Sequence, residues 1–147
     1  MKKGRVHVSF QKRISFSAKE VRRIVRKIQE EVGFHLSELT ISFIDDASIH
    51  EVNREYLNHD YPTDIITFDY SEKNKTFIEG EILISFDTAI MNAKKFKVTP
   101  ENEYTRLIIH GILHLLGYDD RTAAKKKIMK NKENSLLKLV LDSVNKF

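Results

Sequence analysis

Two histidines, two glycines and two aspartates fall within one stretch of the chain, His110-Gly111-Ile112-Leu113-His114-Leu115-Leu116-Gly117-Tyr118-Asp119-Asp120. On a helix, residues i and i+4 lie one turn apart on the same face, so the imidazoles of His110 and His114 can point at one ion. Gly117 stands where a helix can end in a left-handed turn, a conformation that glycine adopts at low cost. The reversed chain then brings Asp120 back over the same face as a third ligand.

Two imidazole nitrogens and one carboxylate oxygen suit zinc, and three protein ligands leave a fourth position for water. An open zinc site of this kind is typical of hydrolases. The sequence contains no cysteine, so zinc ligands must be His and carboxylate side chains. We therefore predict one Zn²⁺ per chain, held by His110, His114 and Asp120, with the zinc-bound water as the catalytic group.

A purely structural interpretation fits the same residues. His110 and His114 could be core or capping histidines of a buried helix, and residues 117–120 an ordinary turn. The metal interpretation is favoured because the spacing reproduces the metzincin pattern His-x-x-x-His-x-x-Gly-x-x-His, with Asp in the last place. Metzincins carry a Glu general base directly after the first His, where this chain has Gly111. A peptidase would therefore lack its base.

Length and composition predict a single domain spanning residues 1–147. The chain has 147 residues, of which 41% are hydrophobic and 31% charged, an ordinary balance for a globular protein. No apolar run approaches the roughly 20 residues that span a bilayer. Met1-Lys2-Lys3-Gly4 leads into an alternating segment and not into the apolar core of a signal peptide. We expect a cytoplasmic protein with no membrane partner.

The net charge of +4 is unevenly distributed. Basic residues dominate positions 1–27, where Glu20 is the only acid, and they gather again before and after the histidine motif. Two basic clusters that bracket a hydrolytic site suit a polyanionic substrate, because phosphate contacts supply most of the sequence-independent affinity for nucleic acids. A solvated lysine-rich surface is the alternative. The second cluster comprises Lys94, Lys95, Lys97, Arg121, Lys125, Lys126, Lys127, Lys130 and Lys132.

Residue patterns predict four strands and about five helices. Alternating or continuous apolar runs predict strands over 5–10, 39–44, 64–69 and 81–86. Ser17 with Glu20 forms a capping box for a helix that ends at Gly33, and Thr99-Pro100 is a strong helix start. The remaining helices are expected from Asp45 or Asp46 through Tyr56, from Asp87 through Phe96, and from Thr122 to about Val144.

These elements predict one compact α+β (α/β-like) domain, without internal repeats. The helix that follows Thr99 is apolar nearly all round, through Leu107, Ile112 and Leu116, so it must be the central buried helix. The order of the strands cannot be derived from these patterns.

Three separated segments resemble the YbeY family of bacterial rRNA-maturation endoribonucleases. The family signature His-Gly-x-Leu-His-Leu-x-Gly-Tyr-Asp-His is matched over residues 110–119. Thr63-Asp64-Ile65-Ile66-Thr67-Phe68 resembles the family's Thr-Asp-Val-Leu-Ser-Phe strand, and Gly80-Glu81-Ile82-Leu83-Ile84-Ser85 resembles its Gly-Asp-Ile-x-Ile-Ser strand. Asn53, Arg54 and Asp60 lie in the segment before the first of these strands, where the family carries the pattern Asn-x-x-(Tyr/Phe)-Arg-Gly-Lys-Asp. The resemblance covers roughly residues 36–145.

The resemblance implies a mostly parallel, mixed sheet of four strands wrapped by helices, with one zinc ion in a cleft beside the buried helix. It also implies zinc-dependent cleavage of single-stranded RNA in 16S rRNA 3′-end maturation and ribosome quality control. The implied partners are single-stranded rRNA and ribosomal particles, with a ribosomal protein as a further partner.

Two positions depart from the family pattern. The third ligand is Asp120 where the family has His, with Asp119 as a competing candidate at a position where the family has a non-ligand Asp. A carboxylate oxygen is an accepted zinc ligand, so we expect binding to survive. Leu57-Asn58-His59 stands where the family has Arg-Gly-Lys. The resemblance therefore implies that a basic side chain facing the RNA phosphate is absent at Leu57, with Arg54 or His59 as a candidate substitute.

Further candidates surround the motif. His59 is a candidate general acid or base, although a plain loop histidine is the alternative, and Arg54, Thr63 and Asp64 are candidate substrate-binding residues. Asp64 and Ser85 could orient the ligand imidazoles, or simply cap strand ends. Tyr61 and Tyr118 could stack on unpaired bases, although Tyr118 could instead pack under the site.

Three functions are compatible with these residues. The first is a metal-dependent endoribonuclease in which basic residues around the cleft neutralise the charge of the transition state. The second is a non-catalytic rRNA- or ribosome-binding assembly factor with a zinc site. The third is a small metalloprotease, which ranks last because Gly111 replaces the Glu base.

Overall fold

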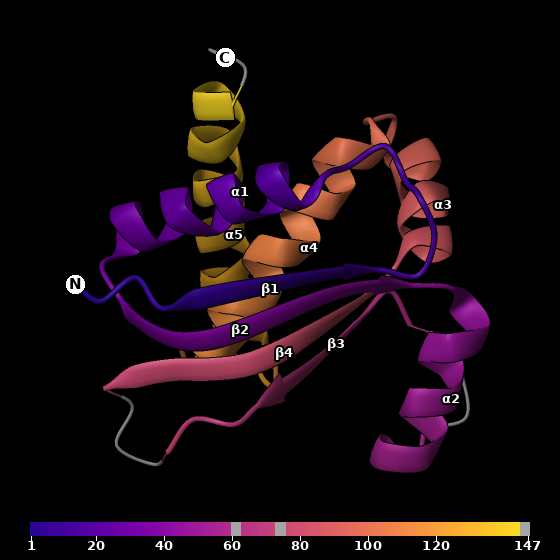
Figure 1. The fold of residues 1–147 in the computed structure, drawn as a ribbon, viewed down its shortest axis with the longest axis horizontal. Coiled ribbons are helices and arrows are strands. Elements are labelled where there is room, and N and C mark those ends of the chain that lie inside the picture. Colours follow the sequence, from indigo (N-terminus) through magenta and orange to yellow (C-terminus); the bar gives the residue numbers. More distant parts are fainter. Residues whose placement is uncertain (60–62, 73–75, 145–147) are drawn as a thin grey trace.

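Four strands form one mixed sheet in the order β1-β2-β4-β3 (Figure 1). β1 (Arg5–Phe10) pairs in parallel with β2 (His35–Ile44), and β2 pairs in parallel with β4 (Phe77–Ser85). The edge strand β3 (Ile65–Asp69) pairs antiparallel with β4. The expected four-stranded, mostly parallel mixed sheet is therefore confirmed. The computed structural model describes residues 1–59, 63–72 and 76–144.

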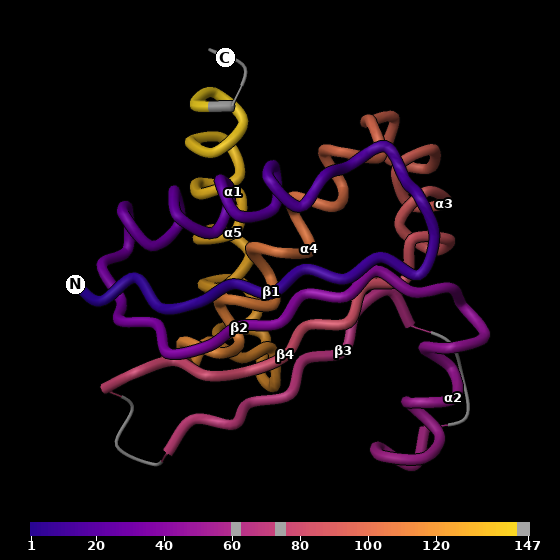
Figure 2. Tube along the Cα trace, viewed as in Figure 1, coloured from indigo at the N-terminus to yellow at the C-terminus, as the bar shows by residue number. Residues whose placement is uncertain are grey.

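Five helices within the described residues surround this sheet. In Figure 2 the trace leaves β1, turns back over the sheet as α1 and re-enters the sheet as β2, which is a βαβ unit. No helix in the described part of the chain has the length and apolarity that crossing a membrane requires. The helices are α1 (Ala18–Val32), α2 (Asp46–Leu57), α3 (Phe86–Phe96), α4 (Pro100–Leu115) and α5 (Ala123–Val144).

The two faces of the sheet bury different helices because successive strand residues point to opposite sides. On β4, Ile82 and Ile84 face the main core, which α1, α4 and α5 complete, whereas Leu83 faces the small cluster under α2. Figure 1 shows α2 set apart from the helices on the other face. Helix α4 is the central helix, as predicted: its apolar residues, from Tyr104 to Leu115, are buried.

Local capping signals place the ends of α1 and α4 as predicted. Ser17 and Glu20 form the capping box of α1, and Gly33 ends this helix with a φ of 81°. Thr99 caps α4, whose first residue is Pro100. At the other end of α4, Gly117 has a φ of 104°, which reverses the chain in the predicted manner.

Several boundaries differ from the predictions. β2 begins at His35 and not at Leu39, and β4 begins at Phe77 and not at Glu81, because both strands are extended by pairing with each other. The cap of α3 is Ser85, whose hydroxyl accepts a hydrogen bond from the Thr88 N–H. The helix therefore begins at Phe86 and not at Asp87, and Phe86 does not belong to the strand predicted over 81–86. Asp87 lies inside the first turn, where its carboxylate accepts from the Asp46 N–H.

Two glycines allow α4 to approach the sheet closely. A Cβ atom added to Gly80 on β4 would lie 2.7 Å from Leu115 Cδ2 and 2.7 Å from the Phe68 carbonyl oxygen. A Cβ atom added to Gly111 on α4 would lie 2.7 Å from Ile82 Cδ1. The contact between the helix and the sheet therefore depends on residues without side chains at both positions.

We predict that Gly80→Ala lowers the free energy of unfolding by about 1–3 kcal/mol, the usual cost of overpacking a filled core. The backbone oxygen of Phe68 cannot move aside as a side chain can. Urea denaturation checks this, with the exposed Ser9→Ala as a control that should change stability by less than about 0.5 kcal/mol. A Gly80→Ala protein as stable as the control would contradict the close approach.

Candidate functional site

The side chains of His110 and His114 converge near the C-terminal end of α4. Their Nε2 atoms lie 3.2 Å apart, and the ring centroids are 4.8 Å apart at an interplanar angle of 72°. Nitrogen ligands at about 2.0–2.1 Å from a tetrahedral zinc ion are separated by about 3.3 Å. The pair therefore has the spacing of two ligands to one tetrahedral ion.

A buried carboxylate fixes the other ring nitrogen of His110. Nδ1 of His110 lies 2.6 Å from Oε1 of Glu133 on α5, whose side chain is 2% exposed. Burial alone would raise the pKa of Glu133, but the hydrogen bond from His110 and the electrostatic interactions with His110, Arg106 and Lys130 lower this pKa to about 2. An ionised carboxylate only accepts hydrogen bonds. Nδ1 of His110 is therefore the donor, and its Nε2 lone pair points toward His114.

Glu133 is itself held by Arg106, at the centre of an ion network between α4 and α5. Arg106 binds Glu103 through two hydrogen bonds of 2.8 and 2.7 Å and reaches Oε2 of Glu133 at 3.3 Å. The hydrogen bond to Glu103 raises the pKa of Arg106 despite its burial. Asp64 Oδ2 lies 3.8 Å from the same guanidinium. The network fixes the position of the carboxylate that orients His110.

Asp120 lies beside the imidazole pair, in the segment that follows α4. It lines a small cavity of about 140 Å³ together with His110. Burial, followed by the electrostatic interaction with His110, lowers the pKa of His114, whereas Asp120 and Asp119 raise it. Among the described residues, no three His, Asp or Glu side chains are gathered closely enough to hold a metal ion. The structure therefore brings the two predicted imidazole ligands together and places Asp120 next to them. The Asp120 carboxylate is not close enough to both imidazoles to complete a three-ligand group.

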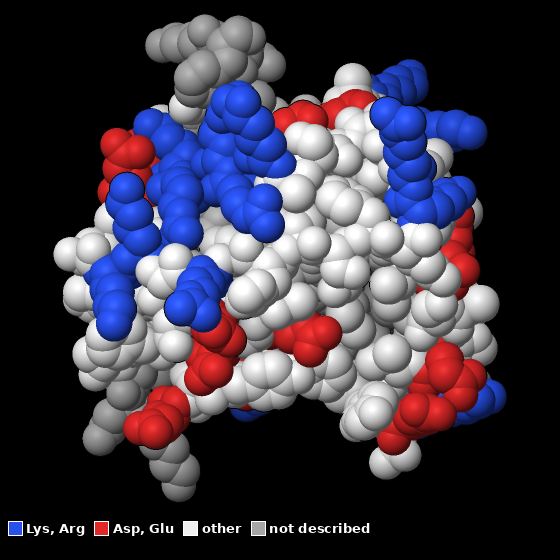
Figure 3. Space-filling view, in the orientation of Figure 1, with Lys and Arg blue, Asp and Glu red and all other residues white. Residues whose placement is uncertain are grey.

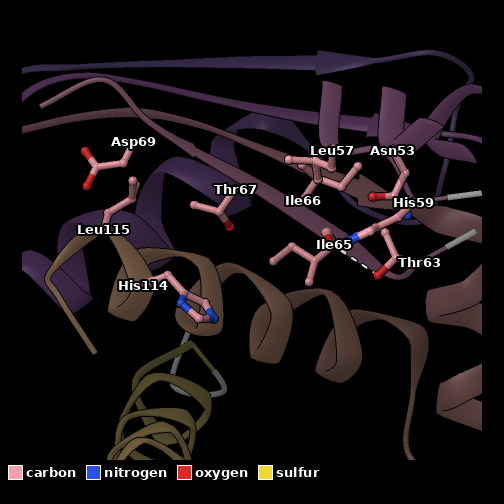
Figure 4. A pocket seen from close by; sticks show the side chains of 10 residues that line it. All are labelled: Asn53, Leu57, His59, Thr63, Ile65, Ile66, Thr67, Asp69, His114 and Leu115. Carbon is pink, nitrogen blue, oxygen red and sulfur yellow. Dashed lines mark hydrogen bonds between the residues drawn. The ribbon is translucent and has the colours of Figure 1, made fainter. Parts of the chain in front are cut away.

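A larger cleft of about 540 Å³ opens on the other side of His114 (Figure 4). It crosses the edge strand β3 between the end of α2 and the end of α4. In Figure 4 the side chains of Ile65 and Thr67 project from β3 toward the His114 ring. Such a cleft gives an extended chain access to the imidazole pair. Its lining residues are Asn53, Leu57, His59, Thr63, Ile65, Ile66, Thr67, Asp69, His114 and Leu115.

The structure separates the predicted substrate-binding residues into two groups. His59 and Thr63 line the cleft, and the Thr63 hydroxyl donates to the Ile65 carbonyl at 3.4 Å. Arg54 lines neither cavity and forms an exposed ion pair with Glu51 at 2.7 Å. Asp64 also lines neither cavity, and it belongs to the Arg106 network, where burial raises its pKa and Arg106 opposes that rise.

Other candidates have structural roles in their observed positions. Ser85 caps α3, and its hydroxyl also donates to Asp46. Tyr118 packs against the main core. Asp119 accepts from the Arg121 N–H at 3.0 Å and pairs with Lys125 at 3.6 Å. Tyr61 and Asp60 lie outside the described residues.

Glu133 and Arg106 were not predicted from the sequence. Glu133 stands in a lysine-rich segment whose composition indicates only a basic cluster. A signal was nonetheless available, because Met129, Glu133, Leu136 and Val140 follow each other at spacings of four, three and four, and all are buried. A carboxylate in the buried stripe of a helix needs a partner on the neighbouring element.

The predicted basic clusters relate differently to the site. Figure 3 shows Lys and Arg side chains gathered over α1, which carries Lys19, Arg22, Arg23, Arg26 and Lys27. None of these residues lines either cavity beside the imidazoles. From the second cluster, Lys126 and Lys130 on α5 line the small cavity together with His110. Only the second cluster therefore contributes cations next to the histidine pair.

Gly111 explains why the site has no base at the metzincin position. Its missing side chain would point at Ile82 in the core, so this position cannot present a carboxylate to the imidazole pair without displacing β4. The arrangement therefore disfavours the chemistry of a metzincin peptidase.

Fold and site together define an α+β protein that presents an oriented histidine pair beside a cleft, an arrangement suited to a hydrolase. The sequence profile of Endoribonuclease YbeY matches residues 7–140, and the chain belongs to this family. The resemblance drawn from the sequence is thereby confirmed, and membership supports an endoribonuclease role.

Relatives agree with this assignment, and a solved structure shares the fold. Endoribonuclease YbeY of Parabacteroides distasonis is 44% identical over 116 residues, which cover 79% of this chain and 80% of that protein. The protein of the same name from Phocaeicola vulgatus is 43% identical over 122 residues, 83% of this chain and 87% of that protein. The solution structure of TM1509 from Thermotoga maritima superposes with a TM-score of 0.68 at 26% identity, covering 96% of this chain and 92% of that one.

We predict that Arg106→Met lowers the free energy of unfolding by about 3–5 kcal/mol, because it leaves the buried Glu103 and Glu133 without their shared cation. Denaturant unfolding measures this change. Arg54→Met is a matched control, since Arg54 also pairs with a Glu three residues earlier but is 55% exposed, against 19% for Arg106. The control should cost no more than about 1 kcal/mol. Equal losses in both variants would show that the network does not hold α5 on α4.

Proposed function

We propose that this protein is a zinc-dependent endoribonuclease that cleaves single-stranded RNA, in the maturation of the 16S rRNA 3′ end and in ribosome quality control. One observation carries the proposal: the Nε2 atoms of His110 and His114 face each other at 3.2 Å, in a pair oriented by the buried Glu133. Membership of the YbeY endoribonuclease family supports RNA as the substrate.

The donor set of the site fits zinc. Two imidazole nitrogens have the required separation, and His110 donates its second ring N–H to a carboxylate, as metal-binding histidines commonly do. Asp120 lines the cavity next to His110 and would supply the oxygen ligand when the ion is bound. His110, His114 and Asp120 would hold the ion, which when bound lowers the pKa of a water ligand and polarises a phosphoryl oxygen.

The cleft supports a single strand as the substrate. Ile65, Leu57 and Leu115 give it apolar walls against which unstacked bases can pack, and RNA bases are accessible in this way in single-stranded segments. Thr63 and Thr67 add hydroxyl groups within the cleft. A strand that lies across β3 therefore brings its backbone to His114.

Residues of the chain carry out the remaining tasks. Glu133 keeps the proton of His110 on Nδ1, so that Nε2 remains a metal ligand. His59 lines the cleft opposite His114, and we assign it as the candidate that transfers a proton to or from the RNA.

We predict that His114→Ala abolishes RNA cleavage while the fold persists, because the variant removes one imidazole of the pair. Cleavage of a labelled single-stranded RNA by zinc-loaded protein, with and without chelator, is the measurement. His7→Ala, at an exposed position of β1, serves as the control and should cleave as the unmodified protein does.

Each outcome of this assay favours one of the competing functions. RNA cleavage that chelator stops supports the nuclease. RNA binding without cleavage, unaffected by chelator, would instead indicate an assembly factor, and hydrolysis of an unfolded protein would indicate a peptidase. Undiminished RNA cleavage by His114→Ala would contradict the assigned site.

We further predict that Glu133→Gln weakens zinc binding by about 10- to 100-fold, the usual effect of removing a partner that orients a ligand. The glutamine amide lacks the negative charge of the carboxylate that holds Nδ1 of His110 at 2.6 Å from Oε1. Competition with a chromophoric chelator gives the zinc dissociation constant. Glu30→Gln, at an exposed position of α1, is the control. Unchanged zinc affinity in Glu133→Gln would show that Glu133 has no orienting role.

A further inference from the structure

The cleft across β3 lacks the cations that a polyanion requires. Its ten lining residues include no Lys or Arg, and Asp69 adds a carboxylate. Affinity for nucleic acid backbones comes largely from Lys and Arg that neutralise phosphates. The basic face of α1 lines neither cavity. Cations that contact an RNA strand at the imidazole pair must therefore come from another element.

Helix α5 supplies such cations on the opposite side of the imidazole pair. Lys126, Lys130 and Glu133 stand at positions i, i+4 and i+7 and so share one face of α5. All three line the small cavity together with His110. Because His114 lines the large cleft and lies 3.2 Å from His110, the two cavities adjoin at the imidazole pair.

The ion pairs around this cavity leave one cation unmatched. Arg106 is committed to Glu103 and Glu133. Lys130 lies 3.2 Å from Oε2 of Glu133, an oxygen that Arg106 already contacts. Lys126 has no acidic side chain within ion-pair distance among the described residues, whereas its neighbour Lys125 pairs with Asp119. The ammonium group of Lys126 is therefore available to an incoming anion.

We propose that Lys126, assisted by Lys130, forms a phosphate-binding subsite for the RNA backbone on the α5 side of the imidazole pair. This inference rests on the proposed function. The strand would lie with bases over β3 and with one backbone phosphate on the face of α5 next to His110. Lysine binds phosphate as a point charge and needs no fixed geometry, which suits a side chain at the exposed rim of a small cavity.

The salt dependence of RNA binding tests the subsite. A fluorescent single-stranded RNA oligonucleotide is titrated with full-length protein in the presence of chelator, which prevents cleavage, at several KCl concentrations. Each phosphate contact with a single strand contributes about 0.7 to the slope of log K against log salt. Lys126→Gln should reduce the steepness of this slope by about that amount and weaken RNA binding several-fold at low salt.

Lys127→Gln is the matched control, because it removes the same charge from the adjacent, exposed position of α5 but lies outside the cavity. It should change the slope by less than half as much. Circular dichroism melting of both variants confirms folding, and the single variant Lys130→Gln should show an intermediate loss.

The outcomes separate this inference from the proposed function. If the unmodified protein binds and cleaves RNA but Lys126→Gln and Lys127→Gln have equal slopes, the subsite is overturned and the nuclease stands. If the unmodified protein neither binds nor cleaves RNA, both are overturned. A selective loss in Lys126→Gln supports the subsite.

Discussion

The carboxylate of Glu133 is buried where α5 packs on α4, and it bonds to side chains of both helices. One oxygen accepts from His110 at 2.6 Å, and the other contacts Arg106 at 3.3 Å and Lys130 at 3.2 Å. Burying a charge is costly unless it is paired and hydrogen-bonded. The position of α5 and the orientation of His110 therefore depend on the same group.

A second constraint fixes where the histidine pair lies relative to the cleft. Gly111 lets α4 approach Ile82, and Gly80 lets the end of α4, at Leu115, approach β4. The close approach sets His114 beside the edge strand β3, whose outer edge is not covered by another strand of the described residues. The packing of α4 on the sheet thus places the His114 imidazole at the cleft, while Glu133 on α5 orients the His110 imidazole.

Sequence patterns were sufficient where the determining contacts are local. Ser17 with Glu20, Thr99 with Pro100, and Gly117 each act within one turn of the chain, and each is found in its predicted role. The spacing of His110 and His114 likewise places both imidazoles together, because it depends only on helix geometry.

Features that depend on distant partners were not predicted. The antiparallel direction of β3 is set by its pairing with β4, and the early starts of β2 and β4 are set by their mutual pairing. The sequence suggests Asp64 as a substrate-binding residue, a partner that orients the imidazoles or a strand cap, but it does not predict the contact of its carboxylate with Arg106 on α4, at 3.8 Å. The role of Glu133 could not be predicted from local sequence, because its partners, Arg106 and His110, precede it by more than twenty residues.

X-ray absorption spectroscopy at the zinc edge of the metal-loaded protein tests the central claim most directly. The account predicts one ion per chain, with two imidazole nitrogens at about 2.0–2.1 Å, and with oxygen ligands, from a carboxylate and an exchangeable water, completing the coordination. A spectrum without two imidazoles, or one in which four protein atoms close the coordination, would contradict it.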